Sequence, residues 1–74
     1  MTQKVQTPTT DREARNIRIK EAMGREGHSR VKLASLLGIA RETLSRKLAG
    51  KAEWRTSELE RMAEIYDREK GFFF

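Results

Sequence analysis

The sequence predicts one small all-α domain, and three observations lead to this prediction. The chain has 74 residues, which suffice for a single hydrophobic core because a second domain needs roughly another hundred residues. Apolar residues recur at helical spacing, whereas no segment alternates as a half-buried strand does. Glycines and capping residues divide the chain into short segments. We therefore expect a bundle of four, or at most five, short helices.

The first helix is expected over residues 11 to 25. Thr10 and Glu13 have the spacing of a capping box, in which each side chain bonds the other residue's backbone amide. Apolar residues then recur at helical spacing until Gly24 and Gly27 interrupt the pattern. The segment between these signals is long enough for about four turns.

The second helix should follow Ser29, which is a good N-cap. Several apolar residues after it fall on one wide face, and Gly38 supplies a left-handed residue that ends the helix. Ile39 is then expected to fold back onto the helix as the apolar contact that commonly accompanies such an end.

The third helix should begin at Ala40 or Arg41 and end before Gly50. Leu44 and Leu48 are its only large apolar residues, so they form a narrow inner stripe. The remaining face is polar, which suggests that it serves a purpose other than packing.

The fourth helix is expected from Thr56, a plausible N-cap, to about Glu69, with Gly71 as its C-cap. Its apolar residues have amphipathic helical spacing; they are Leu59, Met62, Ala63 and Tyr66. Trp54, just before this helix, is expected to be a core or capping residue.

Three parts of the chain can be distinguished. Residues 1–9 are polar and should form a flexible arm. Residues 10–70 should form the domain, and residues 71–74 an aromatic tail containing Phe72, Phe73 and Phe74. Three exposed phenylalanines would form an adhesive patch. They should therefore pack within the chain, form a two-fold contact with a second copy, or be covered by a further element of a longer protein.

The positive charge lies in the middle of the chain. Residues 1–28 carry a net charge of +2, residues 29–51 carry +5, and residues 52–74 carry −2. A polyanionic partner should therefore meet the middle third.

Several classes of function are disfavoured. The sequence contains no cysteine and one histidine, His28, so it offers no zinc site and we expect no metal or cofactor. It has no phosphate-binding glycine loop and no nucleophile with a matched base, so an enzyme with a small-molecule substrate is not expected. No apolar segment is long enough to span a membrane, and we expect a soluble cytoplasmic protein.

The middle of the chain has the layout of a helix-turn-helix, with a turn glycine at Gly38 and apolar anchors on both helices. The segment "SRVKLASLLGIARETLSRKLAGKAEW" resembles the Cro/repressor-type helix-turn-helix domains of phages and bacterial regulators. The likeness extends into "RTSELERMAEIY" and covers residues 17–66. Ala40 departs from the family, which usually places a capping Ser, Thr or Asn there.

The resemblance implies a lambda-repressor-like fold and a sequence-specific regulator of transcription, of the phage or prophage repressor or Cro kind. Its recognition helix, Arg41–Ala49, would read the major groove of double-stranded DNA. Base contacts would come from Arg41, Glu42, Ser45 and Arg46. DNA backbone contacts would come from Ser29, Arg30, Thr43, Lys47, Lys51 and Arg55.

The same sequence leaves some alternatives open. Glu42 could pair with Arg46 on its own helix, and Ser45 could bond back to its helix, instead of reading bases. Members of the family often bind palindromic sites as homodimers, and the phenylalanine tail is a candidate dimer contact. An antitoxin or a recombination accessory factor, which would bind a protein partner on the same fold, is the alternative function.

Overall fold

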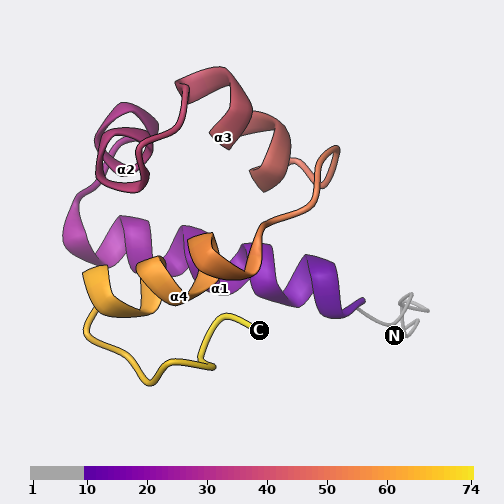
Figure 1. The fold of residues 1–74 in the computed structure, drawn as a ribbon, viewed down its shortest axis with the longest axis vertical. Coiled ribbons are helices and arrows are strands. Elements are labelled where there is room, and N and C mark those ends of the chain that lie inside the picture. The colour runs from indigo at the N-terminus through magenta and orange to yellow at the C-terminus, as the bar shows by residue number, and fades with distance from the viewer. Residues whose placement is uncertain (1–9) are drawn as a thin grey trace, which may run out of the picture.

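The computed structural model describes residues 10–74, which form four α-helices and no strand (Figure 1). Their bounds are Asp11–Glu26 for α1, Arg30–Leu37 for α2, Arg41–Leu48 for α3 and Thr56–Ile65 for α4. In the view of Figure 1, α2 and α3 lie above α1 and α4. The predicted small all-α bundle is confirmed, with four helices. The expected arm, residues 1–9, lies outside the described part of the chain.

Helix α1 is held at both ends by the residues that the sequence indicated. The Glu13 amide donates to Thr10 Oγ1 at 3.0 Å, and the Thr10 amide donates to Glu13 Oε1 at 3.0 Å. These two bonds satisfy amides that the first turn would otherwise leave unpaired. At the other end Gly27 has a φ of 69°, so the helix runs to Glu26 and stops.

The turn between α2 and α3 fixes how the two helices meet. The Lys32 amide donates to Ser29 Oγ at 3.1 Å, which caps the start of α2. Gly38 ends α2 with a φ of 74°, and the Ile39 amide donates to the Ala34 carbonyl at 3.0 Å. Ile39 is partly buried and packs against the core, as predicted. A residue with a side chain would be strained at Gly38, because its φ is positive.

One hydrophobic core joins all four helices and the C-terminal tail. Helix α2 packs against both α3 and α4. The largest fully buried side chains come one from each helix and one from the tail: Ile19, Leu33, Leu44, Met62 and Phe73. By contrast, Ile17 and Val31 have the apolar character of core residues but are 49% and 60% exposed.

The ends of α4 differ from the prediction. The N-cap is Arg55 and not Thr56, which is the first residue of the helix. The helix ends at Ile65, well before Glu69, because Asp67 adopts a left-handed φ of 54°. This reversal directs the chain back to the core, where Phe73 is buried. A continuous helix to Glu69 would carry the tail away from that site.

The phenylalanine tail packs within the chain through Phe73. Its ring meets Tyr66 edge-on, with centroids 6.1 Å apart. Arg15 Nε donates to the Phe73 carbonyl at 2.8 Å, and Arg18 Nη2 donates to the Phe74 carbonyl at 3.3 Å. Phe73 is therefore unavailable as the dimer contact that was one sequence-based alternative. Phe72 and Phe74 remain 38% and 47% exposed.

Tyr66 connects α4 to the turn that follows α1. His28 Nδ1 and the Tyr66 hydroxyl lie 3.0 Å apart, which gives His28 a contact that the sequence did not predict. Burial raises the pKa of Tyr66 to about 12 from its ordinary 10.0, and the negative charge of Glu26 adds to the rise. The folded protein therefore favours the protonated phenol.

Tyr66 should make the stability of the fold fall between about pH 10 and pH 12. The folded-state pKa lies above the unfolded one, so its contribution is fully present below pH 10 and lost as pH rises through about 12. The loss should be on the order of 2 kcal/mol. Urea unfolding at several pH values in this range measures the free energy of unfolding. Tyr66→Phe has no phenol to ionise, so its free energy of unfolding should fall less between pH 10 and pH 12 than that of the wild type. A tyrosinate absorbance titration centred at the ordinary pKa in folded protein would contradict this expectation.

Candidate nucleic-acid interface

Helix α3 has one buried face and one exposed polar face. Leu44, Lys47 and Leu48 are buried, at the spacing that places them on one side of a helix. The other side carries the four predicted base-contact residues. Arg41, Glu42 and Arg46 are exposed, and Ser45 is partly buried. The structure therefore brings the four predicted residues together on the outer face of one eight-residue helix.

The start of α3 tolerates the unusual Ala40. Ala40 has the extended conformation of an N-cap, with φ −70° and ψ 149°, but its side chain makes no capping hydrogen bond. The helix nevertheless begins at Arg41. Core anchoring by Leu44 and Leu48 supplies the stability that the missing cap does not.

The Ser45 hydroxyl accepts a hydrogen bond from the neighbouring helix, and within residues 10–74 it forms none with its own helix. Arg30 Nη1, at the first position of α2, donates to Ser45 Oγ at 3.4 Å. The guanidinium of Arg30 thus lies against the outer face of α3. Within residues 10–74, Glu42 forms no ion pair with Arg46, so the alternative pairing raised by their spacing is not found.

Lys47 is not placed to contact a DNA phosphate, which corrects the prediction made for it. Its side chain is buried, and Nζ lies 2.5 Å and 2.6 Å from the two carboxylate oxygens of Glu58 on α4. Nζ also lies 5.7 Å from the centroid of the Trp54 ring. The sequence suggested a solvated lysine because α3 has only two large apolar residues, but the inner face is wide enough to include Lys47.

Glu58 and Asn16 complete a buried polar network around the end of α3. Besides Lys47, Glu58 Oε1 accepts from the Arg55 amide at 2.8 Å and so caps α4. Asn16 Nδ2 donates to the Lys47 carbonyl at 3.1 Å, while its Oδ1 accepts from Trp54 Nε1 at 2.8 Å. Trp54 is buried as predicted. The sequence prediction missed Asn16 and Glu58, although Asn16 is a polar residue among the apolar positions of α1.

The predicted backbone-contact residues, apart from Lys47, lie on the surface. Thr43 is exposed on α3, and Lys51 and Arg55 are exposed in the segment that leads to α4. Ser29 and Arg30 are exposed at the start of α2. With Lys47 neutralised by Glu58, the exposed cations of the middle segment are Arg30, Lys32, Arg41, Arg46 and Lys51.

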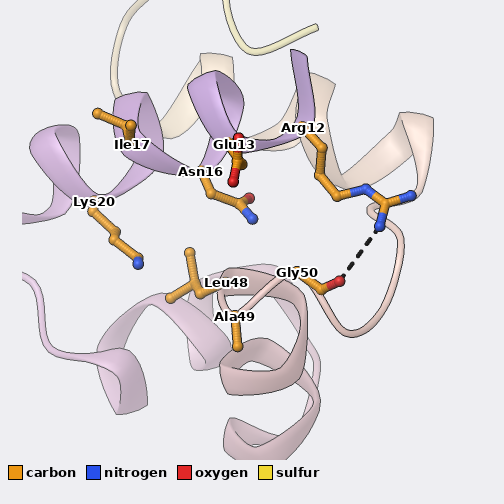
Figure 2. Close-up of a pocket in the computed structure, with 8 residues that line it drawn as sticks. All are labelled: Arg12, Glu13, Asn16, Ile17, Lys20, Leu48, Ala49 and Gly50. Atoms are coloured by element: carbon orange, nitrogen blue, oxygen red, sulfur yellow. Dashed lines mark hydrogen bonds between the residues drawn. The ribbon is translucent and has the colours of Figure 1, made fainter. Parts of the chain in front are cut away.

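A cleft of about 470 Å³ separates α1 from the C-terminal end of α3 (Figure 2). Lys20 extends into it from α1, and Leu48 and Ala49 face it from α3. At one end Arg12 pairs with Glu53 and donates to the Gly50 carbonyl at 3.4 Å. None of the residues predicted to contact DNA lines this cleft.

The described residues include no group of three or more His, Cys, Asp or Glu side chains able to hold a metal ion. No helix in residues 10–74 is both long and apolar enough to cross a membrane.

Comparison with known families identifies the motif. Residues 16–49 match the family described as "Bacterial regulatory protein, Fis family". The matched segment includes α2, the Gly38 turn and α3. This part of the chain is therefore a helix-turn-helix DNA-binding domain, and the match indicates a DNA-binding regulator in general. It does not indicate the Cro or phage repressor type that the sequence resembles. No match was found among curated proteins or among solved structures.

Removing one member of the buried ion pair should destabilise the fold. Lys47→Met leaves the Glu58 carboxylate buried without its partner, at a cost of about 3–5 kcal/mol. Glu58→Gln should also be costly, whereas the double variant should lose less than the sum of the two. Urea unfolding of the four proteins measures this coupling. Additive losses would show that the pair is not coupled, and a stable Lys47→Met variant with weakened DNA binding would restore the phosphate role.

Proposed function

We propose that this protein is a sequence-specific regulator of transcription that reads the major groove of double-stranded DNA with α3. The proposal includes the finer type suggested by the sequence, a phage or prophage repressor or a Cro-like protein that acts as a homodimer in the cytoplasm. It assigns no catalytic activity and no cofactor.

The observation that carries the proposal is the exposed polar face of a rigidly mounted helix. Leu44, Lys47 and Leu48 anchor α3 from beneath, so the outer side chains have a fixed frame. The exposed residues of α3 are not needed for packing, so their identity can serve binding instead. A helix that is already held in place loses less conformational entropy when it docks on DNA.

The residue types on that face suit direct base readout. An arginine can donate two parallel hydrogen bonds to guanine, so Arg41 and Arg46 are candidates for G·C pairs. Glu42 can accept a hydrogen bond from the cytosine amino group. Each such contact gives about 1–3 kcal/mol of discrimination. The negative charge of Glu42 also opposes nonspecific binding to phosphate, which favours a sequence-reading role for this face.

The basic residues around α3 suit a second task, attraction to the phosphate backbone. Ser29 and Arg30 lie at the start of α2, where unpaired amides and the helix dipole attract anions. Lys51 and Arg55 lie beyond the other end of α3. Phosphate contacts on both sides of α3 would fix its position in the groove without selecting a sequence.

Selection of bound duplexes from a random DNA pool, at moderate salt, tests the proposal. A palindromic motif with half-sites about one helical turn apart is the result expected of a dimeric reader. A single short half-site would retain sequence reading but remove the homodimer from the proposal. Binding with no enriched sequence would overturn it, because the basic surface would then be only an electrostatic anchor.

The exposed Phe72 and Phe74 favour one alternative, a protein partner on the same fold. Apolar side chains exposed on a small domain often mark a contact surface. An antitoxin or a recombination accessory factor would then copurify with its partner when expressed from its native operon. A homodimer that purifies alone would favour the regulator.

Arg46 and Lys51 form a matched pair of substitutions, since both are exposed cations. Arg46→Ala should weaken binding to the selected site and relax the preference at one base pair. Lys51→Ala should weaken binding to all duplexes equally and lower the slope of log K against log salt by about one unit. Titrations of selected and scrambled duplexes at several salt concentrations separate the two effects. An equal loss on every sequence for Arg46→Ala would make it a phosphate contact.

A further inference from the structure

Arg30 reaches from α2 onto the outer face of α3. It is the first residue of α2, and its Nη1 donates to Ser45 Oγ at 3.4 Å, although fifteen positions separate the two residues. Within residues 10–74 no carboxylate forms an ion pair with Arg30. Its charge is thus uncompensated, and only one of its five N–H donors is used in this hydrogen bond.

The position of Arg30 does not serve helix stability. A cation in the first turn is unfavourable, because the helix dipole makes that end positive. Helices α1 and α4 carry acidic residues in their first turns, whereas α2 carries none. Arg30 is therefore unfavourable for the stability of α2, and its presence at this position calls for another role.

Ser45 places the Arg30 guanidinium among the residues proposed to read bases. On α3 it lies one turn after Arg41 and three residues after Glu42, so the three share a face. A planar guanidinium that uses one Nη1 proton on Ser45 still presents two parallel donors, which match guanine.

We propose that Arg30 and Ser45 act as one base-reading unit, in which Ser45 positions the Arg30 guanidinium for a guanine in the major groove. Arg30 is then a determinant of sequence preference rather than a phosphate contact alone. This inference rests on the proposed function, because it needs α3 to lie in the groove. Residues of both α2 and α3 would then contact bases.

The unit predicts a pattern that a phosphate contact does not produce. Arg30→Ala and Ser45→Ala should relax the preference at the same base pair of the selected site. Arg30→Ala should reduce discrimination there by about 5- to 150-fold, the range of one good base contact. The double variant should be no less selective than Arg30→Ala, because Ser45 acts through Arg30. Arg30→Lys keeps the charge but not the planar fork, so it should lose the preference as well.

The experiment is a set of binding titrations on duplexes in which each base pair of the selected site is changed in turn. Wild type, Arg30→Ala, Arg30→Lys, Ser45→Ala, the double variant and Lys32→Ala are compared. Lys32 is an exposed cation of the same helix turn and serves as the control; its loss should weaken all duplexes equally. Arg30 and Ser45 lie at the surface, and circular dichroism verifies that each variant is folded.

The outcomes separate this inference from the proposed function. If wild type shows no preference on any duplex, the proposed function fails and the inference fails with it. If wild type is selective but Arg30→Ala weakens all duplexes equally, or Arg30→Lys binds like wild type, only the inference is overturned. Relaxation at different base pairs in Arg30→Ala and Ser45→Ala would also overturn it, since the two residues would then act separately.

Discussion

The orientation of α3 depends on a buried ion pair between Lys47 and Glu58. An isolated helix of eight residues is not stable in water, so α3 exists only because the rest of the fold holds it. Leu44, Leu48 and the packing against α2 hold it on the core, but apolar contacts alone only weakly oppose rotation of the helix. The ion pair of Lys47 with Glu58 on α4, and the hydrogen bond from Asn16 on α1 to the Lys47 carbonyl, are directional and oppose that rotation. The outer residues consequently keep a defined direction.

Such a pair is costly to bury, and the structure reduces the cost by using every polar atom of the network. Glu58 serves both Lys47 and the Arg55 amide, and Asn16 serves both Lys47 and Trp54. A leucine at position 47 could pack more simply, but it would accept several helix rotations. The directional hydrogen bonds of the Lys47 network allow only one rotation of α3. The network therefore trades stability for a unique arrangement of the surface helix.

The sequence predicted most of the fold because its signals are local. Thr10 with Glu13, Ser29, Gly38 and the apolar spacing each specify structure within a few residues, and all four helices were located. The errors lie where distant residues decide the outcome. Helix α4 ends early because Phe73 must reach the core, and the buried Lys47 depends on Glu58 of another helix. Neither contact has a signature in the sequence near it.

The candidate interface was predicted to a similar extent, for the same reason. Arg41, Glu42, Ser45 and Arg46 share a face because helical geometry alone puts them there. The contact between Arg30 and Ser45 crosses a turn whose angle is set by Gly38, so spacing along the chain could not show it. Positions on one helix are predictable from the sequence, whereas contacts between helices need the structure.

The docking of Phe73 also has a consequence for how the molecule folds and opens. The hydrogen bond between Arg15 and the Phe73 carbonyl joins residues 58 positions apart, a wider separation than the 38 positions between Asn16 and Trp54. Closing so long a loop is entropically slow, so we expect the tail to dock after the helices have assembled. By the same reasoning we expect the tail to detach before the helices separate, which would uncover Tyr66. The tail is thus a seam, distant in the chain from the helix-turn-helix, at which we expect the domain to loosen first.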